Sequence, residues 1–225
     1  MLFALGQPVA FLGLLVAFVL ALLIRAYAIR LTARTLGLAE RGESVTPRLR
    51  EDIDAFGAVA AAVAGVGWGK MISVDEVPRF RGRGRAAAVF LAGPVVVLLT
   101  AQLAFLAFVL LFRDTASGLV FFRLSDVLRG QYEGTPPAQF LLALACGLVG
   151  FGLLALIPMP PLDGFGALWS AQRRPGPGMQ GYRLWFEDKN IGVVVLLAAC
   201  FFPLASPLLL RPLDLIGTLF LRLWA

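Results

Sequence analysis

Long apolar runs, separated by polar or proline-rich stretches, make up most of this chain. A helix that crosses a bilayer needs about 20 mostly apolar residues. Runs that meet or approach this length cover 8–24, 86–112, 138–157 and 191–210, and the last is interrupted by Pro203 and Pro207. The first run can continue over 25–38 as a helix whose basic face leaves the membrane. The pattern predicts an all-α polytopic membrane protein with about four to six transmembrane helices.

Shorter apolar segments lie at 53–66 and 213–224. The first has about two-thirds of the spanning length, which favours a short, buried or re-entrant element. The second can span only if it is tilted or packed, with Trp224 as an interfacial anchor. Alternation of polar and apolar residues over 70–76 predicts a short membrane-associated strand, which would precede the basic turn 79–85.

The composition is that of a protein embedded in a lipid bilayer. Hydrophobic residues make up 59% and charged residues 15% of the sequence, and the mean hydropathy is +0.84. The formal net charge of +6 comes from loops between apolar runs, which predicts anionic membrane lipids as partners and no nucleic acid. Cys146 and Cys200 lie inside apolar runs, where a thiol behaves as a small hydrophobe. We expect one membrane domain over 1–225.

Loop charge predicts the orientation of the chain in the membrane. With 53–66 re-entrant, one loop region over 25–85 carries eleven basic residues: Arg25, Arg30, Arg34, Arg41, Arg48, Arg50, Lys70, Arg79, Arg81, Arg83 and Arg85. The region 113–137 carries three basic residues and 163–190 carries four. Because basic loops stay in the cytoplasm, the N-terminus is predicted outside and the loop 25–52 cytoplasmic.

A proline-rich string around an acidic residue is the most informative motif. Asp163 follows an apolar run that is ended by prolines, namely Pro158, Pro160 and Pro161, and it precedes Gly164. An ionisable group near membrane depth is costly to bury and therefore often functional. The alternative is an exit turn that places Asp163 among the lipid headgroups. The residues alone leave both interpretations open.

The string over 156–164 resembles the third signature of the site-2 protease family of intramembrane zinc metalloproteases, N-L-L-P-x-P-P-L-D-G, whose Asp is a zinc ligand. The segment 67–74 is similar to the family's G-W-A-K-P-V-P-V, and 91–94 is similar to its L-A-G-P-x-x-N. The resemblance covers roughly 10–205 and leaves a C-terminal hydrophobic segment, 206–225. It implies a site-2 protease-like core and a multi-pass place in a bacterial inner membrane.

The departures from the family pattern remove its chemistry. The family's first signature is His-Glu-x-x-His, in which two imidazoles on one helix face hold zinc and the Glu is the general base. In this chain Arg25, Ala26 and Ile29 stand at those positions, and the chain has no histidine. The family's two asparagines fall at Val97 and Ala155. The resemblance therefore implies no metal and no other cofactor.

Arg25 at a former ligand position suggests a different role for the remaining carboxylate. A guanidinium there could pair with Asp163 and replace the charge of the metal. We expect a catalytically inactive homologue, a pseudoprotease, that binds or scaffolds transmembrane segments of another membrane protein. One alternative is an accessory structural subunit of a larger membrane complex. Another is an active intramembrane metalloprotease with an atypical ligand set.

Other intramembrane protease chemistries fit the sequence less well. A serine mechanism needs a histidine base, which the chain lacks. An aspartyl dyad needs a second carboxylate beside Asp163, and the candidates Asp54 and Asp75 lie in segments predicted as boundary or loop.

Overall fold

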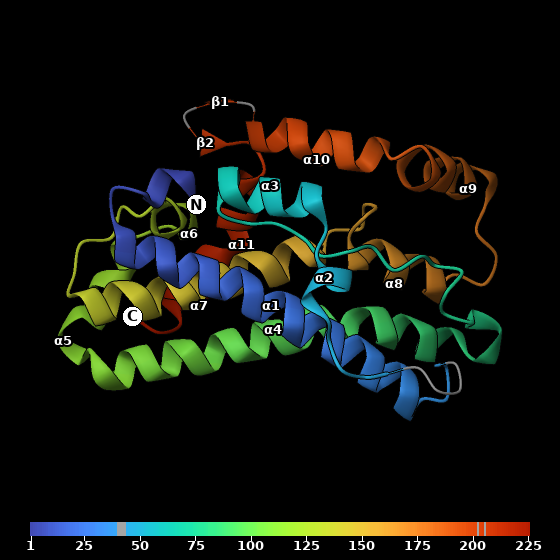
Figure 1. Ribbon diagram of the computed structural model, residues 1–225, viewed down its shortest axis with the longest axis horizontal. Helices are drawn as coiled ribbons and strands as arrows, with labels where there is room; N and C mark the ends of the chain where they lie inside the picture. The colour runs from blue at the N-terminus through green and yellow to red at the C-terminus, as the bar shows by residue number, and fades with distance from the viewer. Residues whose placement is uncertain (40–43, 202, 205) are drawn as a thin grey trace.

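Three long helices form the centre of the molecule. The computed structural model describes residues 1–39, 44–201, 203–204 and 206–225 (Figure 1). Over these residues, α1 (Pro8–Thr35), α4 (Arg83–Leu111) and α7 (Pro136–Ala155) are the helices long and apolar enough to cross a membrane. Each of the three packs against the other two. The predicted class, an all-α membrane protein, is confirmed.

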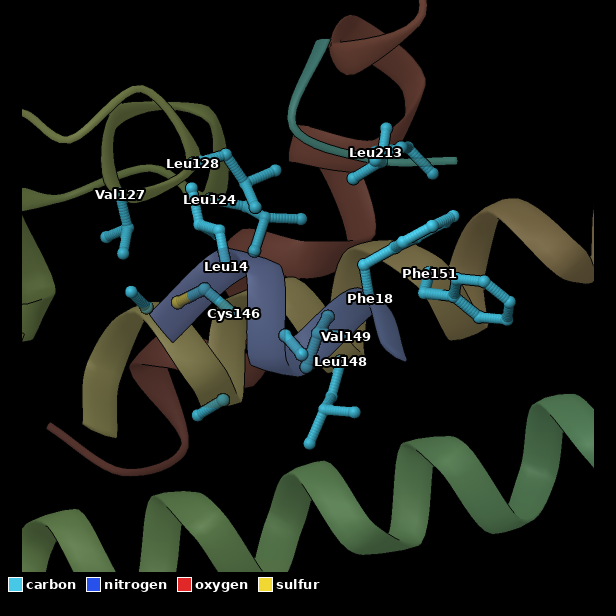
Figure 2. Close-up of a cluster of buried hydrophobic side chains, with 14 of the residues drawn as sticks. Leu14, Phe18, Leu124, Val127, Leu128, Cys146, Leu148, Val149, Phe151 and Leu213 are labelled. Atoms are coloured by element: carbon cyan, nitrogen blue, oxygen red, sulfur yellow. The ribbon is translucent and has the colours of Figure 1, made fainter. Parts of the chain in front are cut away.

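Helix α7 is the most enclosed of the three. Protein covers 78% of its apolar window, against 28% for α4, so α4 presents much more of its surface to the surroundings. Figure 2 shows Leu14 and Phe18 of α1 beside Cys146, Leu148 and Val149 of α7, and all five side chains are buried. Cys146 is a free thiol within this cluster, in agreement with its predicted role as a small hydrophobe.

Glycines set the distance between α1 and α7. A Cβ atom built at Gly147 would lie 2.6 Å from the Cβ of Ala17, and one built at Gly13 would lie 2.6 Å from the carbonyl oxygen of Phe140. Such distances are too short for any side chain, so the two helix backbones are in close contact. Close approach through small residues is how membrane helices gain packing energy without a hydrophobic driving force between them.

The predicted fourth span over 191–210 is not a continuous helix. Helix α10 (Ile191–Phe201) has 11 residues and ends before Pro203. The strands β1 (Pro203–Leu204) and β2 (Ser206–Pro207) follow as a short antiparallel pair, while residues 202 and 205 lie outside the described part. Proline fixes φ and lacks an N–H donor, which explains why the helix stops there in spite of an apolar sequence.

The segment 53–66 forms the helix α3 (Ala55–Ala64). Its 10 residues rise about 15 Å, too little to cross a bilayer, which fits the predicted short element. The Asp54 carboxylate caps α3 by accepting a hydrogen bond from the Gly57 N–H at 2.7 Å. Helix α3 packs against α10, and Figure 1 draws both on the same side of the three long helices.

The C-terminal segment folds back onto the bundle as α11 (Leu210–Arg222). The Asp214 carboxylate accepts hydrogen bonds from the backbone N–H and the hydroxyl of Ser125, both at 2.7 Å. The Trp224 indole donates to the Gln102 side chain at 2.9 Å. The segment is therefore joined to the core by polar contacts as well as by apolar packing.

The predicted strand over 70–76 is wrong, because these residues form a loop with a turn. The N–H of Glu76 donates to the carbonyl of Ser73 at 3.1 Å, and the N–H of Ser73 donates to the Glu76 carboxylate at 3.2 Å. Local side-chain hydrogen bonds of this kind compete with a strand ladder. Where the chain is described, the ladder near this segment is limited to an isolated bridge between Ile53 and Gly69.

Short elements complete the chain and link the long helices. They are η1 (Leu2–Ala4), α2 (Leu49–Asp52), η2 (Arg79–Arg81), α5 (Arg113–Ala116), η3 (Ser117–Phe121), α6 (Leu124–Leu128), α8 (Asp163–Ala171), α9 (Pro177–Arg183) and the π-helical turn η4 (Leu184–Asp188). Arg41, counted in the predicted basic loop, lies outside the described residues.

The close contact of α1 and α7 predicts that a glycine substitution inside the contact lowers the stability of the protein, whereas one outside it does not. Gly147→Ala should lower the free energy of unfolding by about 1–3 kcal/mol, because the new methyl group overlaps Ala17. Gly84→Ala is the control, since a Cβ there meets nothing within 4 Å, and it should be neutral or slightly stabilising. Thermal unfolding in detergent measures both. Equal midpoints for the two variants would contradict the packing described.

Candidate functional site

A buried ion pair joins α1 to the start of α8. The Arg25 guanidinium donates from Nε to Asp163 Oδ2 at 2.6 Å and from Nη2 to Asp163 Oδ1 at 2.5 Å. Its Nη1 donates to the carbonyl of Lys70 at 3.2 Å. Arg25 is 5% exposed and Asp163 is 4% exposed. Both carboxylate oxygens are therefore occupied by one guanidinium in the two-pronged geometry that gives the strongest charge-assisted pairs.

The proline-rich string places Asp163 by folding the chain back on itself. Helix α7 ends at Ala155, the Pro160–Pro161 peptide is cis, and α8 starts directly at Asp163. A Cβ at Gly164 would lie 2.1 Å from the carbonyl oxygen of Leu156, so only glycine allows this return. Pro160, Pro161 and Gly164 are buried and Pro158 is exposed. The string therefore acts as the turn that aims one carboxylate at α1.

Two glycines make room for the Arg25 side chain. A Cβ at Gly93 of α4 would lie 2.8 Å from Arg25 Cγ and 3.0 Å from Ile29 Cδ1. A Cβ at Gly69 would lie 3.0 Å from Arg25 Nη1. These glycines belong to the strings 67–74 and 91–94. The structure thus brings all the quoted strings together around Arg25.

A cavity of about 410 Å³ opens beside the ion pair. Its wall includes Arg25, Ala26 and Ile29, the three residues that the resemblance aligns with the family's His-Glu-x-x-His signature. Apolar and charged groups share the rest of the wall, including Arg30, Asp52, Lys70, Met71, Ile72, Glu76, Val77 and Val89. These three residues therefore share one cavity with charged groups from other segments.

A second ion pair at this cavity was missed by the sequence interpretation. Arg30 donates from Nη2 to Asp52 Oδ1 at 2.5 Å and from Nη1 to Asp52 Oδ2 at 3.1 Å. Asp52 also accepts from the N–H of Arg48 at 2.7 Å. Arg30 lies one helical turn after Ala26 on the same face of α1, a spacing that could have pointed to it. Asp52 has no comparable signal in the sequence.

Val97 and Ala155 do not lie on this cavity. Val97 is 0% exposed and Ala155 is 3% exposed, and both pack inside the helix bundle. The structure brings Arg25, Ala26, Ile29 and Asp163 together at one place. It leaves Val97 and Ala155, which the resemblance aligns with asparagines, in the apolar packing between helices.

The residues present do not fit a zinc ion. Catalytic zinc normally has three protein ligands. In the described ranges, no group of three or more His, Cys, Asp or Glu side chains is placed to hold a metal. Both oxygens of Asp163 are engaged by Arg25, and the cationic guanidinium lies where a metal would bring positive charge. The site is therefore built around an internal ion pair.

The loop that covers one side of the cavity is fastened to the segment around η4. The Ser73 hydroxyl donates to Glu187 Oε1 at 3.1 Å. Arg183 donates from Nε to Glu187 Oε2 at 3.2 Å, from Nη1 to Asp75 Oδ1 at 3.3 Å, and also pairs through Nη2 with Asp75. Burial raises the pKa of the Glu187 carboxyl above its usual value, while Arg183 and Ser73 act in the opposite direction.

The chain is similar to a bacterial protein with a metalloprotease name. That protein, the "Putative zinc metalloprotease YwhC" of Bacillus subtilis (strain 168), is 31% identical over 156 residues. The alignment covers 68% of this chain and 63% of the relative, so it spans less than two thirds of the relative's length. The similarity supports the site-2 protease family indicated by the motif strings. No protein-family model and no solved structure matches the chain.

Removing both members of the buried pair should cost less stability than the sum of the two single removals. Arg25→Met leaves a buried carboxylate and Asp163→Asn leaves a buried guanidinium, so each should destabilise the protein by about 3–5 kcal/mol. The double variant should lose clearly less than the sum of the two. Thermal unfolding of the unmodified protein, the two single variants and the double variant in detergent gives the coupling free energy between Arg25 and Asp163. Additive losses would show that the two groups do not depend on each other.

The raised pKa of Glu187 predicts a pH-dependent stability difference. Because the folded state holds this proton more tightly than the unfolded state, the contribution of Glu187 to stability falls as pH rises from about 4.5 through the raised value. Glu187→Gln removes this titration. The unfolding midpoint of the variant relative to the unmodified protein should therefore increase with pH over that range. A constant difference would show that burial does not shift this carboxyl.

Proposed function

We propose that this protein is a catalytically inactive homologue of the site-2 proteases, a pseudoprotease that binds or scaffolds transmembrane segments of a partner protein. The observation that carries the proposal is the two-pronged contact of Arg25 with Asp163. A guanidinium at the former ligand position satisfies the carboxylate that a metal would otherwise bind. The site is therefore stable in the absence of any ion.

The loss of hydrolysis follows from the missing chemical groups. A zinc-dependent protease needs ligands that hold the metal and a base that takes a proton from the metal-bound water. Ile29 has no donor atom, and Ala26 has no group that can accept a proton. Asp163 has both oxygens engaged by Arg25, so this carboxylate is not available to activate water.

The retained cavity supports a binding role. It is about 410 Å³ in volume and combines an apolar wall from Ala26, Ile29 and Val89 with charged groups at Arg30 and Lys70. An apolar wall suits the side chains of a membrane segment, and the charged groups suit its polar end near the membrane surface. The fold thus keeps a place for a chain segment after the reaction chemistry is gone.

An accessory structural subunit is the second candidate, and the surface of α4 favours it. Leu99, Leu103 and Leu110 are 59%, 66% and 58% exposed on this helix. Such a face contacts either lipid or the helices of a larger complex. In this case the partner would cover α4 and leave the cavity beside Arg25 empty.

We further propose a bacterial inner membrane location, with the N-terminus outside and the loop 25–52 in the cytoplasm. The basic excess of the residues around the end of α1 and the start of α4 supports this orientation. Figure 1 draws these two helix ends at the same end of the molecule, so their basic residues can face one membrane surface.

Metal analysis tests the inactive state. Purified protein, dialysed against buffer with micromolar zinc, should contain far less than one zinc per chain by inductively coupled plasma mass spectrometry, because the ligands are absent. Stoichiometric zinc that is lost in Asp163→Ala would contradict the proposal. Cleavage of a membrane substrate that depends on Asp163 would contradict it as well.

Site-specific photocrosslinking tests where a partner binds. A photoreactive amino acid at Ile72, on the cavity wall, should trap a single-span membrane protein in native membranes. The same amino acid at Phe121, which is 86% exposed and does not line the cavity, is the control and should give no such product. Crosslinks from Leu103 alone, to several subunits of one assembly, would instead support the accessory-subunit function.

A further inference from the structure

A second cavity, of about 610 Å³, lies among α8, α9 and the short helix η2. Its lining includes Arg79, Trp169, Gln180, Arg183 and Asp188. It shares none of its lining residues with the cavity beside Arg25. The metalloprotease resemblance gives this second cavity no role.

The two arginines of this cavity differ in their hydrogen bonding. Arg183 is committed, because it donates to Glu187 and to both oxygens of Asp75. The Arg79 guanidinium lies over the Trp169 ring at 5.5 Å from its centroid. Its Nη1 is buried and has no hydrogen-bond partner among the residues that the structure describes. A buried donor without an acceptor is costly, which points to an acceptor that comes from outside the chain.

The position of Arg79 indicates where that acceptor comes from. The helix η2 (Arg79–Arg81) directly precedes α4, which starts at Arg83 and has the length and composition of a membrane span. Arg81, Arg83 and Arg85 are exposed around it, and Phe80 is 84% exposed beside them. Basic residues next to an exposed aromatic ring are typical of a segment that lies at the level of the lipid headgroups.

We propose that this second cavity binds the phosphate group of a membrane phospholipid, with Arg79 as its charged donor. Arginine pairs with phosphate through two parallel N–H···O bonds, which fits one guanidinium and one phosphodiester. The buried Trp169 ring holds the guanidinium from one side through a cation–π contact. Asp188 lines the same cavity and disfavours a ligand with several negative charges.

This inference does not depend on the loss of catalysis. An active protease and a pseudoprotease would use the second cavity equally, since its residues take no part in the site around Arg25. Lipid binding here would fasten the α8–α9 segment to the membrane surface. The lipid site would also be linked to the loop over the first cavity through Arg183, which contacts Trp169 of the second cavity and Asp75 of that loop.

Native mass spectrometry of the full chain in detergent tests the proposal, with phosphatidylglycerol and inorganic phosphate as separate probes. Phosphatidylglycerol should bind as a discrete adduct, and Arg79→Gln should weaken its binding about tenfold. Arg83→Gln is the matched control, because Arg83 is an exposed arginine of the same basic turn that does not line the cavity, and it should change binding little. The thermal unfolding midpoints of both variants show whether each one is folded.

Several outcomes would overturn the proposal. Equal weakening by the two variants would mean diffuse attraction to a basic surface. Binding of inorganic phosphate with the same affinity and the same dependence on Arg79 would assign the cavity to a free anion. An unaffected lipid adduct in a folded Arg79→Gln variant would place the lipid elsewhere on the protein.

Discussion

The contact between Arg25 and Asp163 is the interaction on which the site and much of its surroundings depend. Two charges buried to 5% and 4% exposure lose nearly all of their hydration, which costs several kcal/mol for each ion. The two hydrogen bonds between them, at 2.6 Å and 2.5 Å, and the third bond to the Lys70 carbonyl offset that cost. Neither residue is tolerable at this depth without the other.

The surrounding backbone is shaped to hold this pair. Gly93 of α4 and Gly69 of the preceding loop leave the space that the arginine side chain occupies. Gly164 lets the chain return sharply after α7, so that Asp163 faces α1. Segments from four parts of the sequence therefore meet at one guanidinium. An internal ion pair joins these segments.

The sequence predicted the long elements well and the short ones poorly. The spans over 86–112 and 138–157 match α4 and α7 to within about three residues, because long apolar runs have few alternatives to a helix. The strand predicted over 70–76 was wrong. Local hydrogen bonds between Ser73 and Glu76 form a turn there, although the alternation of polar and apolar residues suggested a strand. The run 191–210 was predicted as a span interrupted by Pro203 and Pro207, and the structure ends α10 at Phe201, before the first of these prolines.

The candidate site shows a similar division. The resemblance of the sequence to the family singles out Arg25, Ala26 and Ile29, and the structure places all three on one cavity. The Arg30–Asp52 pair and the contacts of Arg183 with Asp75 join distant or weakly patterned positions, so no local spacing indicates them. The contacts of Trp169 could not be predicted from the sequence either, because only the tertiary fold brings Arg79 and Arg183 to its ring.

The central claim is that Asp163 is held by Arg25 rather than by a metal, and solid-state NMR tests it most directly. Protein labelled with ¹⁵N at arginine and ¹³C at aspartate, in bilayers, should show a short dipolar contact between the Arg25 side-chain nitrogens and the Asp163 carboxyl carbon. Arg25→Met identifies the signal by removing it. The account predicts that this contact persists unchanged when zinc is added in excess. Its absence, or its replacement by a zinc-bound carboxylate signal, would contradict the account.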